Sequence, residues 1–143
     1  MKIGIDIGRV IIGGNGEDTF FTEDFLETPE VPGAFEAIFE LPKAGHEIHL
    51  ISKCGEAVEN KSLIWLNYYG FLYAAVPRHR VHFVRKRHLK VFMAQALELD
   101  IFIDDRQDII ESMQKVITHP ILFTSWEQTN AELREIFDIV PEG

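Results

Sequence analysis

The amino-acid sequence predicts an α/β fold of three layers, in which helices cover both faces of a doubly wound, five-stranded parallel sheet. Two observations support this prediction. Short runs rich in β-branched residues alternate with longer segments whose apolar residues recur at helical spacing. The run at residues 2–7 is bounded by glycine, and the run at 101–103 is fully apolar and ends on two aspartates, which indicates buried strands. Strands that alternate with helices in this way are typical of parallel sheets covered on both faces.

The predicted elements follow one another along the chain with short connections. The expected strands are residues 2–7, 46–51, 81–84, 101–103 and 121–123. The expected helices are residues 32–41, 56–69, 87–97, 107–113 and 127–137. Pro32 stands where a first helical turn tolerates proline, Pro42 and Gly45 are expected to end that helix, and Gly70 to close the next. Residues 10–21 (VIIGGNGEDTFF) hold two apolar runs around a glycine-rich turn signal, which predicts a hairpin.

Length and composition indicate one soluble globular domain over residues 1–143. The chain is 46% apolar and 26% charged, and no window approaches the ~18–20 apolar residues of a membrane span. Lys2, Asp6 and Arg9 interrupt the N-terminal apolar stretch that a secretion signal would need. The single cysteine, Cys54, excludes an intrachain disulfide. We therefore expect a cytoplasmic protein that has no membrane partner.

The distribution of charge is uneven. The formal net charge of −9 argues against a general nucleic-acid coat protein, whose surface would be basic. Between Glu59 and Glu98, however, there is no acidic residue, and half of the 14 lysines and arginines lie in this stretch. It is either a solvated basic face or an anion-attracting rim around a site.

Polar side chains follow three of the expected strands. Asp6 ends the first strand, Ser52 follows the second, and the pair at 104–105 (DD) follows the fourth. Lys90 lies in the first turn of the helix before the fourth strand. In a doubly wound sheet, side chains at these strand ends converge on one crevice, which is deepest where the strand order reverses.

A cluster of three carboxylates, Asp6, Asp104 and Asp105, requires a cation. Two such charges at ~4 Å repel by about 4 kcal/mol at an effective dielectric constant of ~20. Hard oxygen ligands favour Mg²⁺. The sequence therefore predicts a magnesium site at this crevice.

The aspartate, serine, lysine and double aspartate, in this order, resemble the four motifs of the haloacid-dehalogenase-like (HAD) hydrolase superfamily. The resemblance covers nearly the whole chain. The segments VPGAFEAI and FIDDRQD are also similar to the 5′(3′)-deoxyribonucleotidase branch and to small bacterial members. The resemblance to the superfamily implies a HAD-like, Rossmannoid fold, in which the hairpin at 10–21 occupies the position of the flap. No insertion after the first or third strand is large enough for a cap domain.

The resemblance also implies roles for these residues. Asp6 would be the nucleophile that accepts a phosphoryl group, and it forms the catalytic set with Ser52 and Lys90. Ser52, Lys53 and Lys90 would bind the phosphate. Lys86 is the alternative to Lys90, which we prefer because it lies inside the helix start.

The metal ligands implied by the resemblance come from two strand ends. Asp6, the backbone carbonyl of Gly8 and Asp104 would coordinate Mg²⁺, with Asp105 in support. Gly8 is also a departure from the family pattern, because phosphatases of the superfamily carry there a second aspartate that serves as general acid and base. A branch-specific nucleotidase activity therefore does not follow from the resemblance.

Structural roles are the alternative for several of these residues. Ser52 could cap the following helix, and the aspartates at 104–105 could cap the next one, Asp105 in particular. Cys54 near a helix start could have a lowered pKa, although an ordinary buried residue is the preferred interpretation. The histidines lack the spacing of a zinc site. Trp126 is expected in the core.

Two functions from different classes remain open. The first is a Mg²⁺-dependent phosphatase or phosphotransferase whose open crevice admits a small phosphorylated substrate, such as a nucleotide, or a nucleic-acid end; a homo-oligomer could cover the crevice instead. The second is a non-catalytic domain that binds a phosphorylated ligand or a protein partner, which Gly8 favours. The start IGIDIG also resembles the phosphate motif of actin-like sugar kinases, but those need two large lobes, which 143 residues cannot supply.

Overall fold

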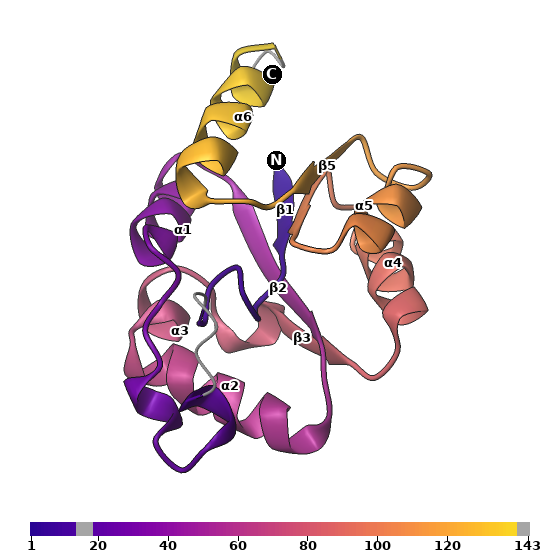
Figure 1. Cartoon of the computed structure of the whole chain (residues 1–143). Helices are drawn as coiled ribbons and strands as arrows, with labels where there is room; N and C mark the ends of the chain where they lie inside the picture. Colours follow the sequence, from indigo (N-terminus) through magenta and orange to yellow (C-terminus); the bar gives the residue numbers. More distant parts are fainter. Residues whose placement is uncertain (14–18, 140–143) are drawn as a thin grey trace.

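The structure is a computed structural model that describes residues 1–13 and 19–139, and it contains the predicted sheet (Figure 1). Its strands are β1 (Lys2–Ile5), β2 (Glu47–Lys53), β3 (Val81–Val84), β4 (Ile101–Asp104) and β5 (His119–Leu122). All pairs are parallel, and the strand order is β3-β2-β1-β4-β5. The order reverses at β1, so the crevice is expected beyond the carboxyl ends of β1 and β4.

Helices cover both faces of the sheet, as predicted (Figure 1). They are α1 (Ala34–Lys43), α2 (Glu56–Tyr68), α3 (Phe71–Ala74), α4 (Arg87–Ala96), α5 (Gln107–Met113) and α6 (Trp126–Ile139). The larger core joins β1 and β2 to α1, α2, α3 and α6, and it contains Trp126, as expected. The smaller core lies under α4 and α5. Gly4 of β1 is needed on this second face, since a Cβ there would lie 2.5 Å from Leu99 Cδ1.

The segment after β1 differs from the predicted hairpin. Ile12 pairs in an antiparallel bridge with Glu30, and Thr19–Phe21 forms a 3₁₀ helix instead of a second strand. This turn buries the Phe20 side chain in the main core, so the side chain is removed from water without any strand pairing. The centre of the predicted turn lies outside the described residues.

Helix α1 differs from prediction at both ends. It begins at Ala34 after an N-cap at Gly33, so Pro32 lies outside its first turn, and it includes Pro42 and ends one residue later at Lys43. After α2, Gly70 adopts a positive φ of 83° and begins the unpredicted short helix α3, which buries Phe71. Within the described residues, no helix combines the length and the apolar character that a membrane crossing requires.

Candidate active site

The carboxyl ends of β1 and β4 bring two aspartates together. Asp104 is the last residue of β4, and Asp6 directly follows β1. The backbone N–H of Asp6 donates to the carbonyl of Ile103 at 2.9 Å, which ties the two strand ends together. Both aspartates are buried, with 7% of Asp6 and none of Asp104 exposed. Buried carboxylates need a partner, because desolvation of an unpaired charge is costly.

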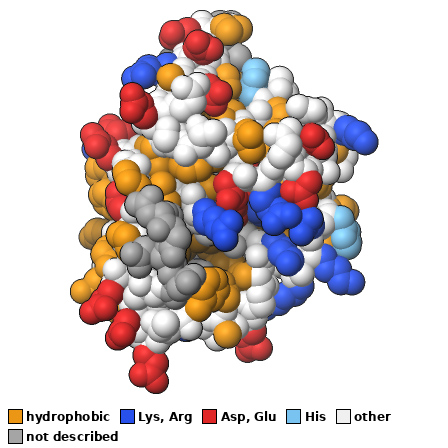
Figure 2. Space-filling model, in the orientation of Figure 1, with side chains coloured by type: hydrophobic (Ala, Val, Ile, Leu, Met, Phe, Trp, Pro, Cys, Tyr) orange, Lys and Arg blue, Asp and Glu red, His pale blue; other side chains and the backbone are white. Residues whose placement is uncertain are grey.

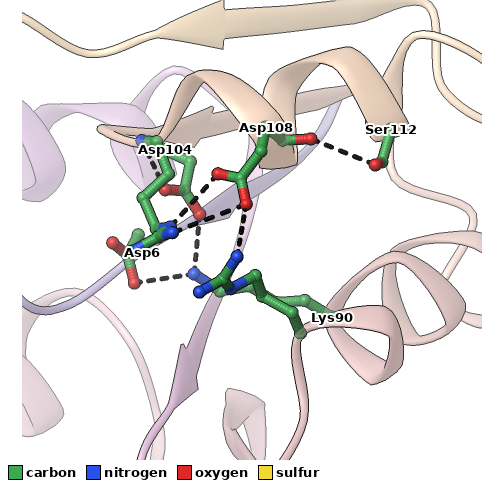
Figure 3. Close-up of polar contacts among 7 residues, drawn as sticks. Asp6, Lys90, Asp104, Asp108 and Ser112 are labelled. Atoms are coloured by element: carbon green, nitrogen blue, oxygen red, sulfur yellow. Dashed lines mark hydrogen bonds and ion pairs between the residues drawn. The ribbon is translucent and has the colours of Figure 1, made fainter.

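Lys90 of α4 is that partner (Figure 3). Its Nζ donates to Asp6 Oδ1 at 2.9 Å and to Asp104 Oδ2 at 2.6 Å, and only 3% of the residue is exposed. Lys86, the alternative residue, is the exposed N-cap of α4, one turn away. The structure therefore places Lys90, rather than Lys86, between the carboxylates.

The charges of this buried cluster are strongly shifted. Burial raises the pKa of Asp6 to about 7, since desolvation and the repulsion of Asp104 outweigh the attraction of Lys90. Burial likewise raises the pKa of Asp104. Burial alone would lower the pKa of Lys90, but Asp6 and Asp104 together raise it above its usual value. Lys90 is therefore a cation at neutral pH, and the two carboxylates hold protons more readily than exposed aspartates do.

Asp105 completes a set of carboxylates that fits a divalent metal. One oxygen from each of Asp6, Asp104 and Asp105 lies within 4.8 Å of the others. In the part of the chain that the structure describes, this is the one cluster of three His, Cys, Asp or Glu side chains with such spacing. Its all-oxygen donors suit a hard cation such as Mg²⁺ and do not suit zinc.

A cavity of about 290 Å³ opens beside this cluster. Asp6, Gly8, Ser52, Lys53, Lys90 and Asp105 line it, so every predicted site residue except the fully buried Asp104 contributes to its wall. Ser52 is buried within β2, and α2 begins at a glycine N-cap without a side-chain cap, so the alternative capping role of Ser52 is wrong. A Cβ at Gly8 would meet nothing within 4 Å.

The capping role considered for Asp105 is also not observed. The N-cap of α5 is Arg106, whose backbone N–H donates to Asp104 Oδ1 at 3.0 Å. Asp104 thus satisfies a helix end and faces Lys90 with its other oxygen. Cys54 is half-buried and burial raises its pKa, which contradicts the alternative of an activated thiol.

Sequence reasoning missed three arginines that also line the cavity: Arg9, Arg87 and Arg106. Arg9 has a positive φ of 64°, a conformation that is uncommon for a residue other than glycine. Arg87 belongs to the acid-free stretch for which an anion-attracting rim was one of two interpretations. Figure 2 shows lysines and arginines gathered on this face of the molecule. Arg106 could have been recognised as a site residue from its position in the sequence, directly after the Asp104-Asp105 pair.

The histidines form no metal site of three ligands within residues 1–13 and 19–139. His49 lies on β2, where its Nε2 is 2.7 Å from Glu47 and its Nδ1 is 3.1 Å from His82 Nε2 on β3. His46 precedes β2 and stacks on Phe137. The two histidines of the predicted second strand therefore have separate structural environments.

Comparison with solved structures identifies the fold. D,D-heptose 1,7-bisphosphate phosphatase from B. bronchiseptica, solved with magnesium and phosphate, matches with a TM-score of 0.63 and 14% identity over 92% of this chain and 87% of that one. A class C acid phosphatase from Bacillus anthracis matches at 0.59 and 13% identity over 99% and 79%. The Pnkp1/Rnl/Hen1 RNA repair complex matches at 0.64 and 12% identity over 85% and 42%. With the strand order, these matches show that the chain has a HAD-like, Rossmannoid fold.

A sequence relative adds to this fold-level result. The chain is 29% identical over 104 residues to a "Putative nucleotidase" of Oceanobacillus iheyensis, which covers 71% of this chain and 53% of the relative. The chain thus spans about half the length of the curated relative that it matches. No family model matches the chain.

Proposed function

We propose that this protein is a metal-dependent phosphatase or phosphotransferase that acts on a small phosphorylated substrate through Asp6. The observation that supports this proposal best is the buried contact of Lys90 with both Asp6 and Asp104, in the wall of a cavity that is also lined by further cations. The names of the sequence relative and of the structural neighbours agree with phosphate-ester chemistry, and a nucleotide is one candidate substrate.

Some side chains around the cavity would bind the phosphate group, and Asp6 would react with it. The Lys90 ammonium and the Ser52 hydroxyl, with Lys53 at the exposed edge, are donors for the oxygens of a phosphate group. Lys90 also keeps Asp6 ionised in part, since its charge and hydrogen bond oppose the effect of burial on the pKa of Asp6. An ionised carboxylate is the form that can attack phosphorus.

The proposed reaction has two displacements. In the first, a carboxylate oxygen of Asp6 forms a bond to phosphorus while the bond from phosphorus to the ester oxygen breaks, and that oxygen leaves with the electron pair. In the second, water or another acceptor hydroxyl attacks the same phosphorus while the bond from phosphorus to the Asp6 oxygen breaks, which restores the Asp6 carboxylate; the proton of the attacking group passes to solvent, from which the departed ester oxygen is protonated. Cationic donors that surround the transferring group stabilise its charge in both steps.

Asp6, the Gly8 carbonyl, Asp104 and Asp105 would hold the metal, for which Mg²⁺ is the candidate. When bound, such an ion supplies Lewis-acid stabilisation of negative charge on phosphate oxygens. Since Lys90 contacts Asp6 and Asp104 through one oxygen each, the clustered carboxylates retain acceptor capacity for a cation.

Gly8 sets the main competing hypothesis, a HAD-like domain that binds phosphorylated ligands without turnover. Glycine has no proton to give to a leaving oxygen, and Arg9 and Lys53, which line the same cavity, are side chains that could assist. The two hypotheses differ in whether phosphate is released.

Mg²⁺-dependent release of inorganic phosphate from an aryl phosphate tests the proposal. We expect release by the native protein with Mg²⁺, and loss of at least a hundredfold in the Asp6→Asn variant, which keeps the shape of the side chain but removes the nucleophile. Asp24→Asn changes an exposed aspartate elsewhere and should leave the rate unchanged. Equal release by native and Asp6→Asn proteins, or none by the native protein, would exclude an Asp6-dependent enzyme.

A further inference from the structure

Two arginines at the cavity converge on a single carboxylate (Figure 3). Arg87 Nη1 of α4 lies 2.7 Å from Asp108 Oδ2, and Arg106 Nε lies 3.2 Å from Asp108 Oδ1. The second Arg106 contact, from Nη2 to Asp108 Oδ2, is 3.5 Å long. All three side chains are about half exposed. The two guanidinium groups therefore come from α4 and from the N-cap of α5, and they meet around one anion that solvent can reach.

The position of Arg87 is unfavourable for its own helix. It is the first residue of α4, whose first turn also carries His88 and Lys90 and contains no acidic residue. The N-terminal end of a helix bears partial positive charge, so cations there are destabilising. Asp108 contributes one negative charge against two guanidinium groups. An excess of positive charge thus remains beside the cavity.

The cavity contains more cations than one phosphate group needs. Lys90 already contacts Asp6 and Asp104. Arg9 and Lys53 also line the wall, and within the described residues neither side chain donates to a protein acceptor. A single phosphate bound at Lys90, Ser52 and Lys53 would leave the three arginines without an anion beyond Asp105 and Asp108.

We propose that Arg87 and Arg106 bind a second phosphate group, so that the substrate is a small molecule with two phosphate groups. This inference rests on the proposed function for the first phosphate, which Asp6 would attack. A terminal phosphate offers three oxygens and up to two charges, and guanidinium groups bind such oxygens in pairs. Asp108 holds the two arginines together in the absence of substrate, and the second phosphate replaces it as their partner.

A compact ligand fits this surface better than a nucleic-acid strand. An extended strand requires a basic groove that follows its backbone over several nucleotides. Here the cations surround one hollow, and the chain as a whole has a net charge of −9. Among small ligands with two phosphate groups, we therefore expect the distance between the two groups to determine which ligand binds best.

Ligand binding tests the proposal independently of turnover. Titration calorimetry on the native full chain without divalent ions compares adenosine 5′-monophosphate with adenosine 3′,5′-bisphosphate and fructose 1,6-bisphosphate. We expect at least one bisphosphate to bind about tenfold more tightly than the monophosphate. Arg87→Gln and Arg106→Gln should each remove about five- to tenfold of the affinity for that bisphosphate and change monophosphate affinity less than about twofold.

Arg85→Gln is the matched control. Arg85 is 50% exposed, as is Arg106, but it pairs with Glu59 at 2.9 Å outside the cavity. We expect this variant to bind all three ligands as the native chain does. Equal affinity for mono- and bisphosphates, or the same loss in Arg85→Gln as in Arg87→Gln, would overturn the second phosphate site.

Two further measurements separate this inference from others. A 5′-phosphorylated oligonucleotide that binds more tightly than either bisphosphate, with the same dependence on Arg87 and Arg106, would overturn the small-molecule assignment in favour of a nucleic-acid end. Arginine-dependent binding of a bisphosphate without Mg²⁺-dependent phosphate release would support the second site while it contradicts the proposed catalysis.

Discussion

Lys90 shows how one side chain makes the candidate site possible. Its ammonium lies between two carboxylates that are almost completely buried, and those carboxylates in turn keep the ammonium charged. Such a cluster is a weak source of stability when complete, because desolvation offsets most of the attraction, but the loss of one member is costly. Substitution of one member of this cluster should therefore lower the free energy of unfolding more than substitution of an exposed charge.

Lys90→Met tests this dependence. The substitution keeps most of the volume but leaves Asp6 and Asp104 buried without a cation. We expect a loss of about 3–5 kcal/mol in the free energy of unfolding at pH 8, measured by urea denaturation without divalent ions. The loss should shrink at pH 5, where Asp6 is protonated. Lys86→Met, at an exposed position, should stay within about 0.5 kcal/mol of the native protein; an equal loss in both variants would contradict the ionic explanation.

Gly8 determines the expected substrate selectivity. A general acid contributes about 10²–10⁴ in rate by protonating a leaving oxygen, so its absence matters most for alkyl phosphates and least for aryl phosphates. The space around Gly8 is open, and its φ is not in the left-handed region, so an aspartate fits there. Gly8→Asp should raise turnover of an alkyl phosphate at least tenfold more than that of an aryl phosphate.

The control for this experiment is Gly8→Asn, which has a similar size but no carboxyl proton. Rates for both substrate classes are compared in the three proteins by phosphate release. Efficient native turnover of the alkyl phosphate would show that another group, such as Arg9 acting through water, supplies the proton. The same gain with asparagine as with aspartate would contradict an acid role for the new side chain.

At the scale of elements, β2 and β3 contain a chain of hydrogen bonds apart from the site. His49 bridges Glu47 and His82, and the two imidazole rings stack with centroids 5.3 Å apart. Burial lowers the pKa of His82, and the neighbouring His49, Arg78 and His79 lower it further. The neutral form of His82 is thus the form that the folded protein prefers.

This preference predicts a pH dependence of stability. Because the pKa of His82 is lower in the folded protein than the usual 6.5, the unfolded chain binds more protons below that pH, and the free energy of unfolding falls as pH falls from about 6.5. In His82→Gln the decline between pH 7 and pH 5 should be smaller. His88→Gln changes an exposed histidine of α4 that is not among the groups shifting the pKa of His82, and it should keep the native slope. Denaturant unfolding across this range measures the difference; identical slopes in native and His82→Gln proteins would exclude His82 as the cause.

Elements with strong local signals were predicted best. The bounds of β3 and α5 agree with prediction, and β1, β2, β4, β5, α2, α4 and α6 differ by one or a few residues. The 10–21 hairpin was wrong because Ile12 pairs with Glu30 and a 3₁₀ turn buries Phe20, an outcome that depends on tertiary packing rather than on local pattern. Helix α1 passed Pro42 by one residue.

The candidate site was predictable only as far as backbone topology determines it. Parallel strand ends must converge, so the proximity of Asp6, Ser52 and Asp104 followed from the strand pattern. The contact of Arg87 and Arg106 with Asp108 depends on which rotamers long side chains adopt, and strand and helix periodicity carries no information about that.

At the scale of the whole molecule, the site should couple metal binding to stability. The pKa of Asp6 is about 7 in the folded protein and 3.8 as the ordinary value. Between these values the folded protein binds more protons than the unfolded chain, so ionisation of Asp6 lowers the free energy of unfolding as pH rises from about 4 to 7. Mg²⁺ binds the ionised carboxylates and competes with these protons, so it should offset this loss.

Thermal melts with and without Mg²⁺ at pH 5 and pH 8 test the coupling. At a hundred times its Kd, a ligand of the native state adds about 2.7 kcal/mol, which for a chain of this size is a rise in Tm on the order of 8 °C. We expect that rise at pH 8 and a much smaller one at pH 5, where protonated Asp6 binds metal poorly. Asp104→Asn removes one ligand charge and should abolish the difference between the two pH values. A Tm that Mg²⁺ leaves unchanged at pH 8, or an equal rise in Asp104→Asn, would mean that the carboxylates of β1 and β4 do not form the metal site.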